Sequence, residues 1–122
     1  MTDALVYDLY EQGRRRLRRG QPRAAVEVLE LAVAREPAKA SLQEMLGRAY
    51  FASAQVERAR AAFARTVELD PTDDYAHFGL GRCLERLGRN ADAAKYLKLA
   101  CALAERPEYR KALDRVHARL RP

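Results

Sequence analysis

The chain has 122 residues, of which 48% are hydrophobic, so it can form one domain with a modest core. It contains no apolar run long enough for a membrane span, and its N-terminal residues lack the basic-then-apolar order of a secretory signal. We therefore expect a cytoplasmic protein without membrane insertion. The net charge of +6 is carried by 19 Arg and only 4 Lys, which favours an anionic partner without deciding between acidic peptide, nucleic acid and lipid.

The first helix is predicted to run from an N-cap at Thr2 to about Arg19. Its inward side is expected to be formed by Leu5, Leu9 and Gly13, at helical spacing.

A dense basic block, residues 14–19, ends this helix. It could be a patch for phosphate or nucleic acid, or the solvated flank of an end helix with Leu17 turned inward. We favour the solvated flank, because a first helix has no preceding neighbour to pack against.

The second helix is predicted to follow Gly20, to have Pro22 as its first residue and to reach about Arg35. Glu36 and Pro37 then turn the chain.

Residues 46–71 read as two further helical runs joined by a short break. Gly47 and Ala59 are small where the two helices would cross, and Tyr50 and Phe63 would fill the space alongside. After them, Asp70 is the expected N-cap of the next helix, with Pro71 at its first position.

The next pair of helices is predicted to turn at Gly88 as C-cap and Asn90 as N-cap, and to end near Glu105. Residues 79–81, Gly-Leu-Gly, lie inside a helix and lack a third glycine, so they do not predict a dinucleotide site. A last helix over residues 108–121 carries an apolar stripe that would cover the preceding pair. The stripe consists of Tyr109, Leu113, Val116 and Leu120.

The pattern recurs every 34 residues, and such a period indicates one helix pair repeated in a stack. The aligned sets are Gly13, Gly47 and Gly81; Ala25, Ala59 and Ala93; and Leu29, Phe63 and Leu97. These residues resemble the tetratricopeptide repeat family. The resemblance implies an all-α solenoid in a right-handed superhelix, with one domain over residues 1–122. Its repeats would cover about residues 6–39, 40–73 and 74–107, followed by a capping helix over about 108–121.

No constellation of catalytic residues is apparent, so we expect neither an enzyme nor a cofactor. His77 and His117 with Cys83 and Cys101 lack the spacing of a zinc site, and no metal is expected. The two cysteines are predicted to be buried free thiols, because they lie about 9 Å apart along their helices.

In the tetratricopeptide repeat family the first helix of each repeat lines a concave groove that holds a peptide or a partner helix. The resemblance therefore implies a binding face made by three helices: Tyr7, Tyr10, Arg14 and Arg18; Ser41, Glu44, Arg48 and Phe51; Tyr75, Phe78, Arg82 and Arg86. Arg14, Arg48 and Arg82 follow the repeat period and would form a ladder that captures carboxylates.

We accordingly expect a non-catalytic adaptor for an acidic peptide or helix. One alternative is a basic protein that binds nucleic acid through residues 14–19, and another is a self-associating module that forms a homo-oligomer. One subfamily holds chaperone tails with a set of Lys and Asn residues. The matching positions here are Tyr10, Arg14, Met45, Tyr75 and Gly79, so that mode of binding is not expected.

Overall fold

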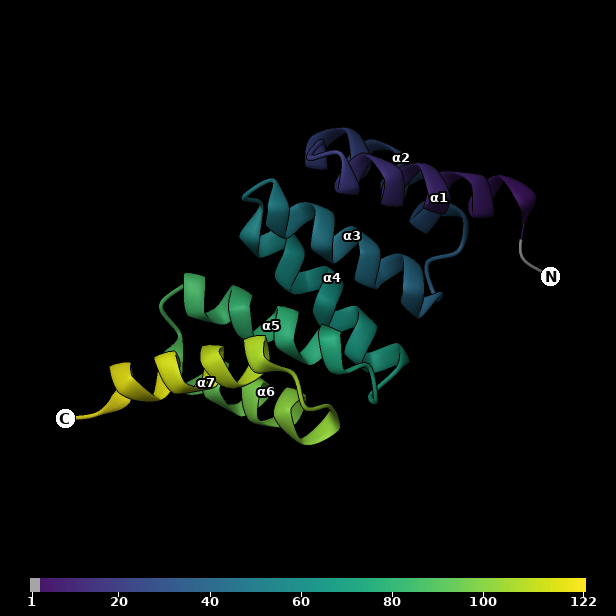
Figure 1. Ribbon diagram of the computed structural model, residues 1–122. Helices are drawn as coiled ribbons and strands as arrows, with labels where there is room; N and C mark the ends of the chain where they lie inside the picture. The colour runs from purple at the N-terminus through teal and green to yellow at the C-terminus, as the bar shows by residue number, and fades with distance from the viewer. Residues whose placement is uncertain (1–2) are drawn as a thin grey trace.

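The computed structural model describes residues 3–122, which form seven α-helices and no strand. Consecutive helices pair and step across the molecule in chain order (Figure 1). They are α1 (Ala4–Arg18), α2 (Pro22–Arg35), α3 (Ala40–Ala52), α4 (Val56–Leu69), α5 (Asp74–Arg86), α6 (Asn90–Leu103) and α7 (Pro107–Leu120). The predicted all-α solenoid is confirmed.

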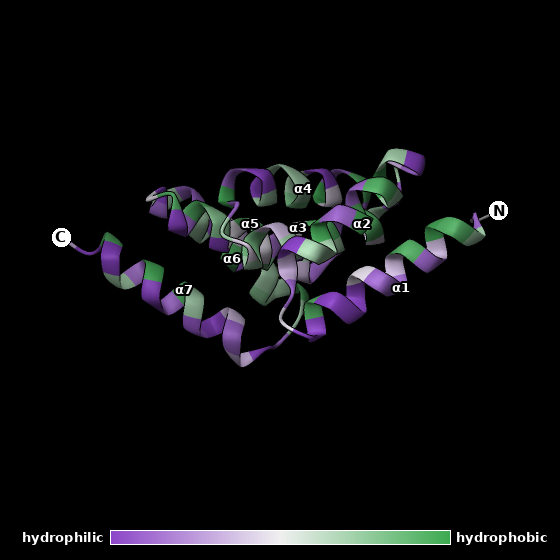
Figure 2. Ribbon diagram, turned by 90° about the horizontal axis from the view of Figure 1, so that it is seen from above, coloured by the Kyte–Doolittle hydropathy of each residue, from purple (hydrophilic) through white to green (hydrophobic). Residues whose placement is uncertain are grey.

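The helices form two layers. In Figure 1, α1 and α7 lie in front of α2 and α6, and the view from above places α4 on the opposite side from α1 and α7 (Figure 2). Among the described residues, α1 contacts α3, α3 contacts α5 and α5 contacts α7, whereas α2, α4 and α6 do not contact one another. The odd-numbered helices are therefore the closer-packed layer, and the stack curves toward them.

The helices of each pair approach closely where the repeat places a glycine. A Cβ atom added to Gly47 would lie 2.8 Å from the Phe63 ring, and one added to Gly81 would lie 2.7 Å from Leu97. Ala59 is fully buried at the same crossing. Since real Cβ atoms do not approach other carbons so closely, the small residues permit the packing that the sequence predicted.

Two helix starts differ from the prediction. The expected cap at Thr2 lies outside the described residues, and α1 is capped by Asp3, whose Oδ1 accepts a hydrogen bond of 2.9 Å from the Leu5 amide. The N-cap of α5 is Asp73 instead of Asp70, and Pro71 lies in the turn. Asp70 instead accepts from the Thr72 amide at 3.1 Å.

The start of α6 and two apolar stripes are also corrected. Asn90 is the first residue of α6, and the cap position belongs to Arg89. Leu5 is 43% exposed, and the neighbouring Val6 is buried in its place. Leu120, at the end of α7, is likewise exposed. The buried stripe of α7 contains Ala112 in addition to Tyr109, Leu113 and Val116.

Candidate binding groove

The first part of the predicted face lies between α1 and α3. A small cavity of about 190 Å³ separates the two helices and is lined by Val6, Tyr7, Tyr10, Lys39, Ser41 and Leu42. The structure thus brings together three of the predicted residues, Tyr7, Tyr10 and Ser41. The Tyr7 side chain is 60% exposed and available to a ligand.

The middle of the face is built around Arg48 on α3. Its guanidinium carbon lies 3.7 Å above the centre of the Tyr75 ring, and its Nη2 donates a 3.1 Å hydrogen bond to Glu44. Stacking on an aromatic face stabilises a cation and fixes its orientation. Arg48 is therefore already engaged within the protein, although its side chain stays 38% exposed.

The third part of the face is a cluster of two arginines around one aromatic ring. The guanidinium carbons of Arg82 and Arg86 lie 5.1 and 5.4 Å from the centre of the Phe51 ring. Because these arginines are four residues apart on α5, they share one side of the helix. The ring on α3 therefore holds both cations in place.

The three arginines of the predicted ladder are not equivalent. Each of them makes an ion pair with a glutamate on its own helix, Arg14 with Glu11, Arg48 with Glu44 and Arg82 with Glu85, but Arg48 and Arg82 also lie against aromatic rings. Arg18 is exposed at the end of α1.

Phe78 is not open in the groove, contrary to the prediction. It is only 6% exposed because Tyr109 of α7 stacks on it, with 4.6 Å between ring centres. The sequence stripe predicted that α7 covers the third pair, but not which residue of α5 it would cover. Phe78 therefore belongs to the core.

A polar cavity on the same face was not predicted from the sequence. A volume of about 350 Å³ lies where α3, α5 and α7 meet, and it holds four carboxylates but only two guanidinium groups. Its lining residues are Glu44, Arg48, Asp73, Asp74, Tyr75, Arg106, Glu108 and Tyr109. One signal was available in the sequence, because Asp74 and Glu108 are one repeat period apart in the first turns of α5 and α7.

Two carboxylates of this cavity, Glu44 and Asp74, have opposite pKa shifts. Burial raises the pKa of Glu44, the nearby Asp73 adds to the rise, and Arg48 only partly opposes it. Burial would also raise the pKa of Asp74, but hydrogen bonds from Tyr109 and Arg106 lower it overall. The cavity is therefore short of positive charge around Glu44.

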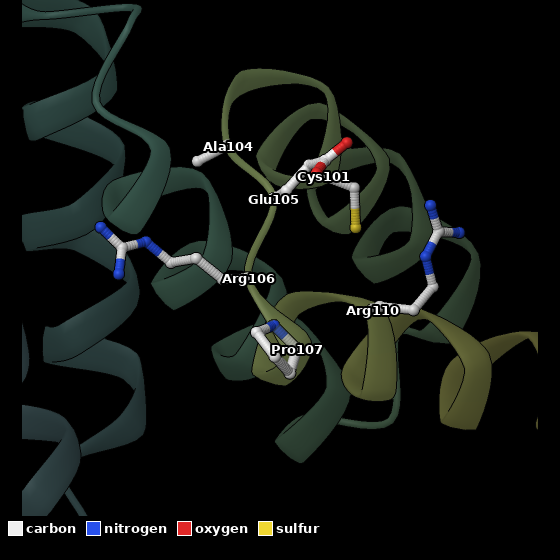
Figure 3. A pocket seen from close by; sticks show the side chains of 6 residues that line it. All are labelled: Cys101, Ala104, Glu105, Arg106, Pro107 and Arg110. Atoms are coloured by element: carbon white, nitrogen blue, oxygen red, sulfur yellow. The ribbon is translucent and has the colours of Figure 1, made fainter.

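Other chemical groups lie away from the groove. Cys83 and Cys101 are free thiols, and burial raises the pKa of Cys83 to about 12, which keeps it protonated and unreactive. Cys101 is only half-buried, unlike the prediction, and lines a cavity of about 430 Å³ at the junction of α6 and α7. Figure 3 shows Cys101 and Arg110 on one side of the linker and the Arg106 guanidinium on the other.

His77 is an interior histidine. It is buried, its Nε2 lies 2.9 Å from the Pro71 carbonyl oxygen, and its ring stacks on Tyr96. Within residues 3–122, no group of three His, Cys, Asp or Glu side chains is placed to hold a metal ion. None of the helices in this range is long and apolar enough to cross a membrane.

A stack of paired helices with one closely packed layer defines a helical-repeat protein. The family model for the tetratricopeptide repeat matches residues 10–74 and 44–109, and the chain belongs to that family. No curated protein matches the sequence.

Solved structures with low sequence identity share the fold. The first repeat domain of Spaghetti (RPAP3), bound to the HSP90 peptide SRMEEVD, is 18% identical with a TM-score of 0.93, covering 98% of this chain and 96% of that one. The Yersinia enterocolitica type III secretion chaperone SycD, in complex with a peptide of the translocator YopD, is 22% identical with a TM-score of 0.81, covering 98% and 92%. The Sgt2 repeat domain from Aspergillus fumigatus is 17% identical with a TM-score of 0.90, covering 97% and 80%.

Proposed function

We propose that this protein is a non-catalytic adaptor whose groove on α1, α3, α5 and α7 binds an acidic peptide of a partner protein. Two of the similar structures hold peptides, which supports a peptide as the ligand. The acidic character rests on the side chains of this chain.

The observation that carries the proposal is the cluster of Phe51, Arg82 and Arg86. Both guanidinium groups lie against the ring, and neither has a carboxylate within hydrogen-bond distance among the described residues, the nearest being Glu85 at 3.8 Å from Arg82. An arginine with open N–H groups binds carboxylates in a planar, bidentate manner. Phe51 itself is half-buried and offers apolar contact to a ligand.

The proposal is tested by selecting linear peptides from a display library and measuring their affinity by fluorescence anisotropy. We expect the enriched peptides to carry Asp or Glu residues, and we expect Phe51→Ala to weaken their binding at least tenfold, because truncating a hot-spot residue costs about 2 kcal/mol or more. This substitution leaves the net charge unchanged, so a general electrostatic effect cannot explain a loss.

The matched control is Leu31→Ala, which removes an exposed apolar side chain from α2 in the other layer. It should change affinity less than twofold. If Phe51→Ala is equally harmless, the groove is not the binding site. If the protein instead prefers oligonucleotides, with a steep loss of affinity as salt rises, the basic block at residues 14–19 becomes the better candidate.

A further inference from the structure

The two ends of the α5 surface carry opposite charge. At the C-terminal end, Arg115 and Arg119 of α7 both donate to Glu85, at 2.7 Å each. Those bonds occupy the Glu85 carboxylate, so Arg82 keeps only a longer contact to it, at 3.8 Å, and Arg86 has no carboxylate within ion-pair distance in residues 3–122. Three guanidinium groups therefore share one carboxylate at this end, and Arg86 adds a fourth cation.

Arg82 and Arg86 are held close together before any ligand arrives. Phe51 stacks against both of them, and Arg82 also lies 5.6 Å from the Phe78 ring. Like charges four residues apart on a helix repel each other. An anion between them would relieve that repulsion, and little side-chain freedom would be lost because the rings already restrict both groups.

The N-terminal end of α5 has the reverse balance. The cavity of about 350 Å³ holds Glu44, Asp73, Asp74 and Glu108, with Arg48 and Arg106 as its cations. Arg48 is paired with Glu44 and Arg106 with Asp74, at 3.1 and 3.4 Å. Within residues 3–122 neither Asp73 nor Glu108 has an ion pair, although Asp73 accepts the Ala76 amide at 3.0 Å as the N-cap of α5. The cavity therefore keeps an excess of two carboxylates, which would repel a further carboxylate and attract a cation.

The distance between the two ends is set by the helix itself. Asp74 and Arg86 are the first and last residues of α5, which places them about 18 Å apart at 1.5 Å per residue. An extended peptide covers that distance with about five residues.

We infer that the groove selects a peptide with separated charges, whose carboxylates dock on Arg82 and Arg86 over Phe51 and whose opposite end carries Lys or Arg facing Asp73 and Glu108. This inference rests on the proposed peptide-binding function and sharpens it, because a uniformly acidic ligand would meet the acidic cavity. The helix C-terminus at Arg86 does not supply the positive charge, since its dipole is negative; the arginine side chains do.

The test uses fluorescein-labelled synthetic peptides of nine residues at physiological salt. One peptide carries two Glu at its start and two Lys at its end, a second has the reverse order, a third is acidic at both ends and a fourth has Gln at all four positions. The peptides with separated charges are neutral overall, so the protein's charge of +6 favours the acidic peptide in any non-specific binding. We expect one order of separated charges to bind at least tenfold more tightly than the acidic peptide.

Two charge reversals locate the ends of the bound peptide. Arg86→Glu should weaken the peptide with separated charges at least tenfold, and Glu108→Lys should weaken it while strengthening the acidic peptide. The matched controls are Lys98→Glu on α6 and Glu105→Lys in the α6–α7 linker, both exposed outside the groove, and each should change affinity less than twofold. Circular dichroism melting of each variant checks that the fold is retained.

Equal or tighter binding of the acidic peptide to the wild-type protein would overturn the inference, as would a harmless Arg86→Glu. A second outcome would refute the charge separation alone. In that outcome none of the four synthetic peptides binds, while the display-selected peptides still bind the wild-type protein and lose affinity for Phe51→Ala. Failure of Phe51→Ala to affect the selected peptides would refute the proposed function itself.

Discussion

At the scale of single residues, the turn inside each helix pair has one position with a left-handed backbone, which is glycine in two of the turns and alanine in the third. Gly20, Ala54 and Gly88 are one repeat period apart, and all three have positive φ, at 72°, 64° and 79°. In the second turn the Gln55 amide donates to the Tyr50 carbonyl at 2.8 Å, and the Arg89 amide bonds Leu84 in the same way. Ala54 thus adopts a left-handed conformation in which its Cβ is strained.

We predict that Ala54→Gly stabilises the protein by about 0.5–1 kcal/mol. The relief of left-handed strain is about 1–2 kcal/mol, and the greater freedom of glycine in the unfolded chain offsets part of it. Urea unfolding measures the change. The control is Ala61→Gly, at an exposed position inside α4, which should be destabilising by roughly 0.5–1 kcal/mol. If Ala54→Gly destabilised the protein, the left-handed conformation of Ala54 would not be strained.

At the scale of elements, α7 is attached to α5 at both ends. Near its start, the Tyr109 hydroxyl donates to Asp74 at 2.7 Å, and its ring stacks on Phe78. Near its end, Arg115 and Arg119 bond the buried carboxylate of Glu85. The apolar stripe of α7 therefore covers α5 in one register, and hydrogen bonds define that register. In Figure 2 most of the α7 ribbon has the purple of hydrophilic residues, interrupted by green apolar positions.

We predict that Glu85→Gln destabilises the protein by about 1–3 kcal/mol at neutral pH, toward the lower value because both arginines are partly solvated. Hydrogen bonds from Arg115, followed by its charge and that of Arg119, lower the pKa of Glu85 despite its burial. A lowered pKa means that the stabilisation is complete above the ordinary carboxyl range and is lost as the pH falls through the folded-state value.

Urea unfolding of wild type and Glu85→Gln between pH 7 and pH 3 checks this expectation. The difference between the two proteins should begin to shrink as the pH falls through the ordinary carboxyl pKa of about 4.3, where the unfolded chain takes up a proton, and should go on shrinking until the folded Glu85 is protonated as well. Glu68→Gln is the control, since Glu68 forms an exposed ion pair with Arg65 and its loss should have little effect. A difference that stays constant with pH would show that the ion pairs contribute nothing to stability.

At the scale of the whole molecule, Phe63 connects two helix pairs. Its ring packs against Gly47 of α3 and against Gly79 of α5, where an added Cβ would lie 2.6 Å from the ring. Repeat proteins are stabilised by such interfaces between neighbouring units. One buried side chain therefore couples the second pair to the third.

We predict that Gly79→Ala destabilises the protein by about 1–3 kcal/mol through overpacking, although Ala normally favours a helix over Gly by about 1 kcal/mol. Thermal and urea unfolding should show a lower midpoint. Combining it with Phe63→Leu, which shortens the side chain, should be less destabilising than the sum of the two single changes. If Gly79→Ala stabilised the protein, α4 and α5 could move apart to accommodate the added methyl group at no cost in folding free energy.

The amino-acid sequence by itself determined the architecture, because the 34-residue period reflects packing and turn requirements that each helix pair must meet on its own. Small residues must lie where the helices of a pair cross, and Gly20 and Gly88 must occupy the left-handed turns. These needs arise between residues close in the chain, so each repeat displays them. The arginine surplus and the aromatic residues that would line a groove were also visible.

Only the tertiary structure decided which of those side chains stay open to a ligand. Phe78 is covered by a residue 31 positions later, Arg48 is engaged by Tyr75 from the next repeat, and the acidic cavity combines three helices. Such contacts depend on the register of neighbouring helices, which the repeat pattern leaves open within a turn. Burial and charge compensation arise between distant segments, and they divide the groove into its basic and acidic ends.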